Sequence, residues 1–553
     1  MRGNKLFSGY SGYTVNIIPI FITIISIFLL TSVFEARAAV VTHSETISAH
    51  TTWASADIHW VTGTVTVSPG IVLTIEPGTI VKFNSGTRLD VNGALYAVGS
   101  ASQKIVFTSW RDDSFGGDTN GDGASAGQAG DWGRISFYDT VIDFLTRLEH
   151  VVVRYGGAGN AGNVYMVQAD VPVVSSDISY GSSFGIYTYN ASPLIEGNTI
   201  SNNGSHGIYH LYGSSPVDRN NTITGNSHGI YVQYATPVID GNTITGNTNY
   251  GIYYVDARDA AEITNNTITG NNKPVRLPFS SLPGVSAGNI LSPNTKNQIE
   301  FWGNTLSRSL VLPADPVNIY YQAGGTATVA TGVKLTVAPG VIWKLTNNAV
   351  LDVNGALYAV GSASQKIVFT SWRDDSFGGD TNGDGASAGQ AGDWGRISFY
   401  DTVIDFLTRL EHVVVRYGGA GNAGNVYMVQ ADVPVVSSDI SYGSSFGIYT
   451  YYASPLIEGN TISNNGSYGI YHLYDSSPVD RGNTITGNDQ GIYVQYATPV
   501  IEGNTITGNA NWGIYHVDAR NAPVIKGNTI TGNLRSMIIP ASSMPNSAEG
   551  NIL

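Results

Sequence analysis

The chain has 553 residues, a net charge of −14 and no cysteine. The lack of cysteine excludes a disulfide framework and any thiolate metal or redox site. Only 12% of the residues are charged and acidic residues predominate, so nucleic acid is not expected as a partner, because phosphate binding needs clustered lysine and arginine.

Residues 1–38 have the layout of a secretory signal peptide. Arg2 and Lys5 precede an apolar run from Ile17 to Phe34, and Ala36-Arg37-Ala38 places small residues at positions −3 and −1 of a cut after Ala38. The run of about 18 residues is also long enough to span a bilayer. We therefore expect an exported protein that is secreted, displayed at the cell surface or periplasmic. Its only membrane contact would be an uncleaved signal.

The remainder of the chain contains a long internal duplication. Residues 89–291 recur as residues 351–553 without insertion or deletion, and residues 89–189 are identical to residues 351–451. Each copy begins with alternating apolar and polar residues around a Pro-Gly turn, at Val72–Phe83 and Lys334–Leu345, a pattern typical of short strands. We expect two tandem units, residues 39–300 and 301–553.

An acidic segment runs from Asp112 to Gly123 and recurs from Asp374 to Gly385. Aspartate, asparagine and glycine stand at positions 1, 3, 5 and 6 of a calcium loop of the EF-hand kind, but position 12 is Ala129 and no flanking helices are evident. Asp131, or Asp112 and Asp113, would complete the ligand shell. We expect a structural calcium ion, with a solvated acidic loop as the alternative. The predicted ligands are Asp118, Asn120, Asp122 and Asp131, and in the second copy Asp380, Asn382, Asp384 and Asp393.

The second half of each copy repeats a shorter unit. In the first copy Gly-Ile-Tyr begins at Gly185, Gly207, Gly229 and Gly251, with Asn-Thr-Ile steps between them. A short fixed period predicts stacked units that bury their apolar faces against neighbours. Glycine and asparagine suit the left-handed corners between short strands. Outside the signal no apolar period of 3.6 residues occurs, so helices should be few.

These Gly-Asn-Thr-Ile and Gly-Ile-Tyr coils resemble the right-handed parallel β-helix repeats of exported bacterial, carbohydrate-associated proteins. The resemblance implies an all-β solenoid over nearly the whole chain after the signal. It implies little about activity, because this fold hosts lyases, hydrolases, adhesins and non-catalytic stalks.

Strand alternation places the isoleucine of Gly-Ile-Tyr inward and the tyrosine outward. A column of exposed tyrosines could stack on sugar rings, or the rings could stack on one another and stiffen the sheet. The candidate carbohydrate-binding residues are Tyr187, Tyr209, Tyr231, Tyr253, Tyr449, Tyr471, Tyr493 and Tyr515. The asparagines Asn198, Asn221, Asn242 and Asn266 repeat at a turn, where stacked amides would satisfy buried polar groups.

We therefore expect a non-catalytic exported protein that binds polysaccharide or acts as an adhesive or structural spacer. The alternative is a polysaccharide lyase or glycoside hydrolase, which needs converging carboxylates or a base beside a cation. The acidic segment with Arg111 and Arg134 is the densest place for such chemistry, and Glu196, Asp218 and Asp240 could line a groove.

Three further motifs carry weaker hypotheses. A copper-associated role would need histidine ligands, which copper favours. The histidines that occur in both copies are His150 with His412 and His210 with His472. Threonine pairs such as Thr222-Ile-Thr224 resemble an ice-binding array. Gly157 to Gly162 matches a dinucleotide pattern, but no helix follows it, so we interpret it as a turn.

Overall fold

The computed structural model describes residues 38–255, 262–282, 288–314, 319–517, 523–541, 544 and 549–553. Both sequence copies fall in one compact unit, Ala39–Leu553. Residues 1–37 of the predicted signal, residues 1–38, lie outside the described residues. In the described part of the chain, no helix is both long and apolar enough to cross a membrane.

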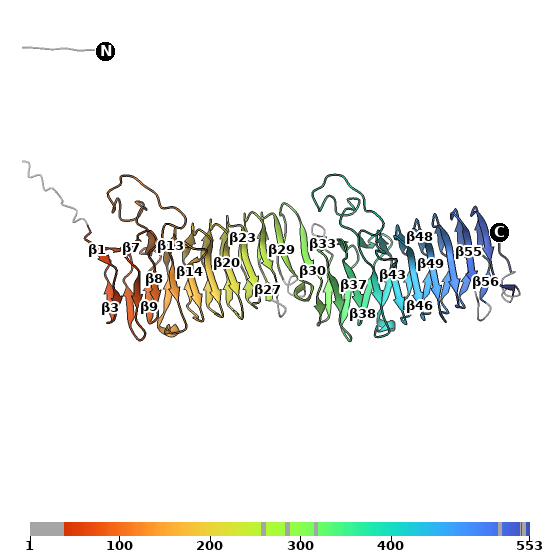
Figure 1. Cartoon of the computed structure of the whole chain (residues 1–553), viewed down its shortest axis with the longest axis horizontal. Coiled ribbons are helices and arrows are strands. Elements are labelled where there is room, and N and C mark those ends of the chain that lie inside the picture. Colours follow the sequence, from red (N-terminus) through yellow and green to blue (C-terminus); the bar gives the residue numbers. More distant parts are fainter. Residues whose placement is uncertain are drawn as a thin grey trace, which may run out of the picture. The chain divides into compact units, whose positions relative to one another are not determined.

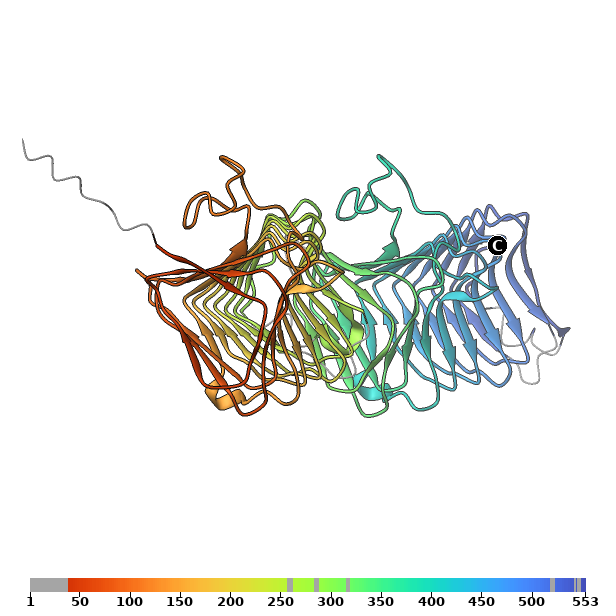
Figure 2. The same cartoon turned by 60° about the vertical axis from the view of Figure 1, so that its left-hand side comes forward.

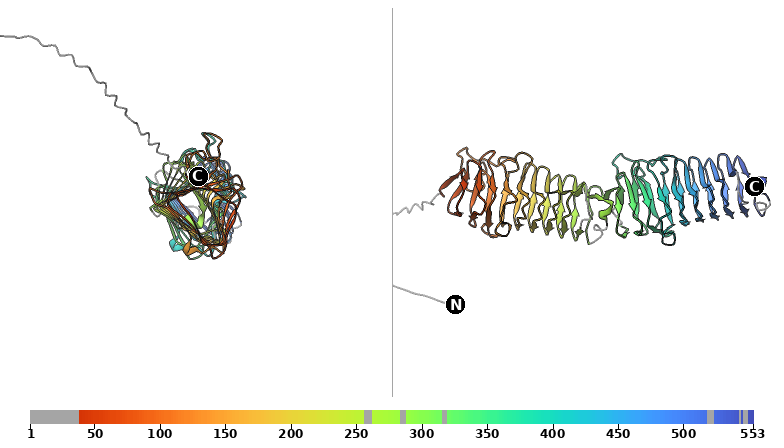
Figure 3. Two further views of the ribbon diagram at one scale, coloured as in Figure 1. Left: turned by 90° about the vertical axis from the view of Figure 1, so that its left-hand side faces the viewer. Right: turned by 60° about the horizontal axis from the view of Figure 1, so that its bottom comes forward.

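The compact unit is a solenoid in which each coil contributes three short strands to three stacked sheets (Figure 1). Except at the ends of the sheets, each strand pairs in parallel register with the strands before and after it in the stack, for example Ile186 with Ile208 and Ile208 with Ile230. This confirms the predicted all-β parallel solenoid. Seen end-on, successive coils superimpose around a common core (Figure 3).

Five sheets, named A to E, account for the strands. Sheet A comprises β1 (Val40–His43), β4 (Ile58–Val61), β7 (Ile80–Phe83), β10 (Ile105–Ser109), β13 (Val151–Arg154), β16 (Asp177–Ser179), β19 (Thr199–Ser201), β22 (Thr222–Thr224), β25 (Thr243–Thr245) and β28 (Thr267–Thr269). Sheet C comprises β3 (Thr51–Trp53), β6 (Val72–Ile75), β9 (Ala94–Val98), β12 (Arg147–Glu149), β15 (Val173–Val174), β18 (Leu194–Glu196), β21 (Val217–Arg219), β24 (Val238–Asp240) and β27 (Glu262–Thr264).

Sheet B runs through both copies. In the first copy it comprises β2 (Thr46–Ile47), β5 (Val65–Val67), β8 (Leu89–Val91), β11 (Ile135–Phe137), β14 (Gly162–Val167), β17 (Phe184–Tyr189), β20 (His206–Leu211), β23 (His228–Gln233), β26 (Tyr250–Tyr254) and β29 (Lys273–Pro278). It continues with β30 (Gln298–Trp302), β33 (Ile319–Gln322), β36 (Ile342–Leu345), β39 (Ile367–Ser371), β42 (Val413–Arg416), β45 (Asp439–Ser441), β48 (Thr461–Ser463), β51 (Thr484–Thr486), β54 (Thr505–Thr507) and β57 (Thr529–Thr531).

Two sheets belong to the second copy alone. Sheet D comprises β31 (Thr305–Leu306), β34 (Thr326–Val329), β37 (Val350–Val353), β40 (Ile397–Phe399), β43 (Gly424–Val429), β46 (Phe446–Tyr451), β49 (Tyr468–Leu473), β52 (Gln490–Gln495), β55 (Trp512–Val517) and β58 (Arg535–Ile538). Sheet E comprises β32 (Leu310–Leu312), β35 (Lys334–Val337), β38 (Ala356–Val360), β41 (Arg409–Glu411), β44 (Val435–Val436), β47 (Leu456–Glu458), β50 (Val479–Arg481), β53 (Val500–Glu502) and β56 (Val524–Lys526). Short 3-10 turns η1 (Asp143–Leu145), η2 (Phe279–Ser281) and η3 (Asp405–Leu407) join strands.

Strands of the second copy lie one sheet away from their equivalents in the first copy. Strands β39 and β42 repeat the sequences of β10 and β13, and β36 is the equivalent of β7. The first-copy strands lie in sheet A, yet their second-copy equivalents continue sheet B. The Gly-Ile-Tyr strands therefore lie in sheet B in the first copy and in sheet D in the second. Even so, the long loops that follow β10 and β39 project from the same side of the stack (Figures 1 and 2).

The core is a continuous column of apolar side chains with two asparagine ladders at its corners. Ile186, Ile208 and Ile230 are fully buried, as the alternation predicted. Asn198 Nδ2 donates to Asn221 Oδ1 at 3.0 Å, and Asn221 Nδ2 to Asn242 Oδ1 at 2.9 Å. The predicted structural role of these amides is confirmed. A second ladder, which the sequence analysis did not identify, comprises Asn203, Asn226, Asn247, Asn271 and Asn294.

Candidate functional site

A column of tyrosines follows the outer surface of sheet B in the first copy. Tyr187, Tyr209, Tyr231 and Tyr253 occupy equivalent positions of successive coils and are half-buried. Tyr165 of β14 extends the column by one coil. In sheet D the same column comprises Tyr427, Tyr449, Tyr471, Tyr493 and Tyr515. The outward orientation that strand alternation predicted is thus present in both copies.

The rings within each column contact one another. The centroids of Tyr165 and Tyr187 are 4.6 Å apart with planes inclined by 2°, whereas Tyr209 meets both Tyr187 and Tyr231 edge to face. Burial raises the pKa of Tyr187, and that of Tyr209 to about 12. Ring-to-ring packing, one of the two alternatives, therefore exists. It leaves half-buried rings along the sheet surface, some parallel and some perpendicular to their neighbours.

A second aromatic column lies beside the first, at the position just before Gly-Ile-Tyr. It comprises Phe184, His206, His228 and Tyr250 in sheet B, and Phe446, Tyr468, Gln490 and Trp512 in sheet D. His206 stacks on Tyr231 at 4.3 Å and packs edge to face on Tyr209. Burial lowers the pKa of His206 to about 3 and that of His228 to about 4. The sequence analysis missed this column, although an aromatic residue or histidine precedes most Gly-Ile-Tyr steps.

Each acidic loop gathers three carboxylates. Ligand oxygens of Asp113, Asp118 and Asp122 lie within 4.8 Å of one another, as do those of Asp375, Asp380 and Asp384. Asp118 accepts backbone hydrogen bonds from Gly121 at 2.6 Å and Gly123 at 3.1 Å. The equivalent bonds from Gly383 and Gly385 hold the pKa of Asp380 below its usual range. In the first loop Asn120 Nδ2 donates to Asp122 Oδ2 at 2.8 Å, and Asn382 is the equivalent residue of the second loop.

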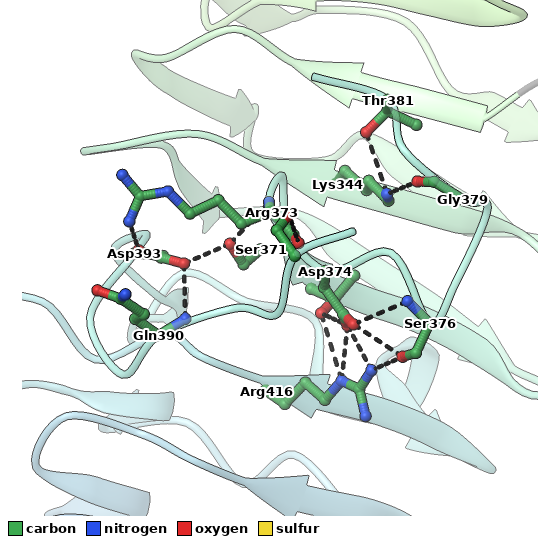
Figure 4. A network of polar contacts seen from close by, with 12 residues as sticks. Lys344, Ser371, Arg373, Asp374, Ser376, Gly379, Thr381, Gln390, Asp393 and Arg416 are labelled. Atoms are coloured by element: carbon green, nitrogen blue, oxygen red, sulfur yellow. Dashed lines mark hydrogen bonds and ion pairs between the residues drawn. The ribbon is translucent and has the colours of Figure 1, made fainter. Parts of the chain in front are cut away.

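Asp131 and Asp393, both predicted as ligands, lie outside these triads. Asp131 Oδ2 accepts hydrogen bonds from Ser109 Oγ at 2.6 Å and from the Gln128 backbone at 2.8 Å. Asp393 makes the same contacts and pairs with Arg373 at 3.2 Å (Figure 4). Asp131 and Asp393 anchor the bases of their loops. The third carboxylate of the triad is Asp113 in the first loop and Asp375 in the second.

The neighbouring buried aspartate holds the loop to the solenoid. Arg154 makes a bidentate pair with Asp112, with Nε and Nη2 each 2.7 Å from a carboxylate oxygen. Burial would raise the pKa of Asp112, but hydrogen bonds from Thr108, Ser114 and Arg154 hold it below its usual range. Asp374 and Arg416 repeat this pair (Figure 4).

A buried lysine lies beneath each loop. Lys82 Nζ donates to Gly117 O at 2.7 Å, and Lys344 Nζ donates to Gly379 O at 2.7 Å and Thr381 Oγ1 at 3.0 Å (Figure 4). Burial lowers the pKa of both lysines, while the nearby aspartates oppose that shift. The amino group of a lysine is therefore held against a backbone carbonyl of each loop. In the second loop Lys296 also reaches Asn382 O, at 3.3 Å.

The histidines predicted as copper ligands do not gather. His210 is fully buried, with its ring nitrogens 2.8 Å from Thr188 Oγ1 and Asp218 Oδ2, and His472 repeats this arrangement. In the described ranges, the groups of three or more metal-ligating side chains are the two aspartate triads. The groove suggested for Glu196, Asp218 and Asp240 is also absent, because Asp218 points into the core while the other two are on the outer surface.

The threonine pairs form ordered outward columns. Thr222, Thr243 and Thr267 are in direct register on sheet A, with the intervening isoleucines fully buried. Thr484, Thr505 and Thr529 repeat the column on sheet B. Ice binding by these columns stays a prediction. Gly157 and Gly159 have positive φ angles of 86° and 77°, which fits the turn expected there.

Curated proteins give no significant match to the sequence. Three kinds of solved structure are similar at low identity. The periplasmic alginate epimerase AlgG is 11% identical over 76% of this chain and 80% of that chain, with a TM-score of 0.24. The catalytic domain of a GH87 alpha-1,3-glucanase in complex with tetrasaccharides is 12% identical over 87% and 64%, with a TM-score of 0.19. A PL6 family alginate lyase, AlyGC, is 11% identical over 94% and 98%, with a TM-score of 0.18.

The family model described as "Right handed beta helix region" matches residues 148–305 and 410–553, more than half of the chain. Together with the parallel three-sheet coils, this match shows that the chain belongs to the right-handed β-helix family.

Proposed function

We propose that the protein is exported and binds polysaccharide along its two aromatic faces without catalysing a reaction. We name these faces by their columns: the first-copy face comprises the two aromatic columns of sheet B, and the second-copy face those of sheet D. The observation that carries the proposal is the pair of adjacent ring columns, present in both copies and interrupted in the second copy by Gln490.

The physical argument rests on periodicity and surface chemistry. Coils repeat at the strand spacing of about 4.8 Å, so each face offers rings at regular steps to a polymer that is itself periodic. Aromatic rings with polar tips provide flat apolar area together with hydrogen-bonding groups, a combination that suits sugar rings. Contiguous apolar surface of this kind on a soluble protein commonly marks an interaction site.

The fixed geometry of the faces also favours binding. The rings are positioned by mutual packing and by short bonds such as Tyr209 OH to Gln233 Oε1 at 2.7 Å. Because these side chains are already ordered, little conformational entropy is lost when a ligand is bound. Ring-to-ring packing therefore supports the binding role and does not compete with it.

Calcium in the acidic loops is a second part of the proposal. Asp113, Asp118 and Asp122 offer converging carboxylate oxygens, the ligands that Ca²⁺ prefers. Asp113 Oδ1 is buried and has no hydrogen-bond partner in the structure. We assign the ion a structural role, closing the loop beside the Asp112–Arg154 pair.

The test is a binding and turnover screen. The purified protein is titrated against neutral and acidic polysaccharides, and the same mixtures are assayed for new reducing ends and unsaturated products, with and without EDTA. Binding without product supports the proposal. Product formation that Asp118→Ala abolishes would replace it with a lyase or glycosidase activity centred on the loop. If no polysaccharide binds, the polysaccharide-binding role is refuted.

A further inference from the structure

The tyrosine column of the first-copy face ends in charged residues. Along sheet B the register runs from Tyr253 to Arg276, then to Glu300 and Tyr321, and then to Lys344 beneath the second acidic loop. Beside it, Tyr250 is followed by Lys273. This junction is formed by β29, β30 and β33, where the second copy enters the stack one sheet out of phase.

The charges at the junction form a compact network around one carboxylate. Glu300 is almost fully buried and lies 2.7 Å from Lys273 Nζ, 3.2 Å from Arg276 Nε and 2.7 Å from the Tyr250 hydroxyl. The side chains of Lys273 and Arg276 are 19% and 29% exposed, against 6% for Glu300. Lys273 and Arg276 surround the single carboxylate of Glu300, so the solvent-facing part of this network is positive. The chain as a whole, in contrast, has a net charge of −14.

Arg276 also borders a hollow in the surface. The hollow has a volume of about 210 Å³ and is lined by Tyr253, Tyr254, Val255, Arg276 and Trp302. The guanidinium lies over the rings of Tyr253 and Trp302, at 5.1 and 5.7 Å from their centroids, and Nη1 donates to the Tyr253 hydroxyl at 2.8 Å. Pockets for whole small ligands span about 300–1,000 Å³, so this hollow suits one unit of a longer chain.

We propose that this junction cluster, Lys273, Arg276, Glu300 and Trp302, is a subsite for a sugar unit that carries an anionic group, a carboxylate or a sulfate ester. An arginine fixed over two rings presents a planar fork to such a group. The inference rests on the proposed polysaccharide binding and adds a charge preference to the first-copy face. The second-copy face lacks this feature, because Arg535 and Ile538 stand where the first copy has Lys273 and Arg276, and β58 is the last strand of sheet D.

The duplication supplies a matched test. Arg276→Ile installs the residue found at the equivalent second-copy position and leaves Glu300 paired with Lys273. Full-length wild type and variant are titrated by calorimetry against oligogalacturonate, its methyl ester, dextran sulfate and dextran. Arg535→Ala, which removes the second-copy cation equivalent to Lys273, is the control. Circular dichroism checks that each variant is folded, and Arg276→Lys, which keeps the charge without the fork, is a second variant.

We expect Arg276→Ile to weaken binding of an anionic probe about tenfold and to leave its neutral counterpart unchanged. Arg535→Ala should change neither, and Arg276→Lys should lie between. A response to oligogalacturonate identifies a carboxylate, and one to dextran sulfate a sulfate ester. Equal affinity of wild type and Arg276→Ile for every probe that binds would overturn the subsite but leave the proposed function intact. If none of the probes or screened polysaccharides binds, both proposals are overturned.

Discussion

Replacing Asn221 with alanine removes one rung of the buried asparagine ladder. Asn221 Oδ1 accepts hydrogen bonds from Asn198 N at 2.9 Å and Asn198 Nδ2 at 3.0 Å, and its own Nδ2 donates to Ile195 O at 2.8 Å. The residue is 1% exposed, so water has little access to the groups it satisfies. The substitution therefore leaves two buried backbone groups, the Asn198 N–H and the Ile195 carbonyl, without these partners.

The size of the effect follows from these two groups. An unsatisfied buried backbone donor or acceptor costs about 1–3 kcal/mol. For Asn221→Ala we therefore expect the opening of the surrounding coils to become easier by about 2–6 kcal/mol. Thr222→Ala, at the exposed neighbouring position, should change it by no more than about 0.5 kcal/mol.

Native-state hydrogen exchange read by mass spectrometry is the suitable assay. Long repeat arrays depart from all-or-none unfolding, so a single global free energy would average over many coils, whereas exchange reports opening locally. The second copy provides a replicate, because Asn483 makes the same contacts with Asn460 N at 2.9 Å and Ile457 O at 2.8 Å. Asn483→Ala should produce the same local loss.

The reasoning would be refuted by exchange rates in the β18–β22 segment that match those of wild type. It would also be refuted if Asn221→Ala cost no more than Thr222→Ala. A loss that spread evenly over the entire chain would contradict the local nature of the ladder.

Three further predictions address pH, the loop and calcium. Burial lowers the pKa of His206 to about 3 and that of His228 to about 4, from the ordinary value of 6.5. Below pH 6.5 the unfolded chain therefore binds more protons than the folded chain. We expect these coils to lose stability as the pH falls from about 6.5 to 4. The second copy has tyrosine and glutamine at these positions, and its own buried histidine with a lowered pKa, His516, lies in β55. Exchange in β49 should therefore show no matching loss, and equal acid sensitivity of β20 and β49 would contradict this. Asp112→Ala removes the carboxylate that pairs with Arg154 and should destabilise the loop by about 3–5 kcal/mol. Limited proteolysis should then cleave the loop faster than in wild type, and unchanged cleavage would refute the anchoring role. Calcium chloride should raise the melting temperature of wild type but not of the Asp118→Ala/Asp380→Ala double variant, and a wild type that shows no shift would remove the metal assignment.

Much of the fold could be predicted from the sequence because its pattern is local and repeated. In a Gly-Ile-Tyr strand successive side chains point to opposite faces, so Ile208 is buried and Tyr209 faces outward. The repeat gives the same pattern in one coil after another. The asparagine ladder was predictable for the same reason, since one residue type recurs at one corner of each coil.

The displacement of the second copy by one sheet could not be read from the sequence. It arises between β28 and β33, where the Gly-Ile-Tyr pattern is absent and the chain joins sheet B twice in succession, through β29 and β30. Lys273, Arg276 and Glu300 come together only through that pairing, so the junction cluster has no signature in the sequence.

The acidic loop was predicted in part. The spacing of Asp118, Asn120 and Asp122 indicated a calcium loop, but which carboxylate completes the triad depends on tertiary contacts. Asp131 is held by Ser109 and Gln128, while Asp113, whose Oδ2 accepts hydrogen bonds from Ser125, lies beside Asp118 and Asp122. Such a choice between nearby aspartates is made by packing and not by spacing.

The central claim is that the aromatic faces bind polysaccharide, and the most direct measurement compares ring-deleted variants in one titration series. Tyr209→Ala and Tyr471→Ala, separately and together, are titrated against the polysaccharide that wild type binds most tightly, with Thr222→Ala as control. The account predicts a loss of severalfold for each single variant, a larger loss for the double variant, and none for the control. Unchanged affinity in the folded double variant would contradict it.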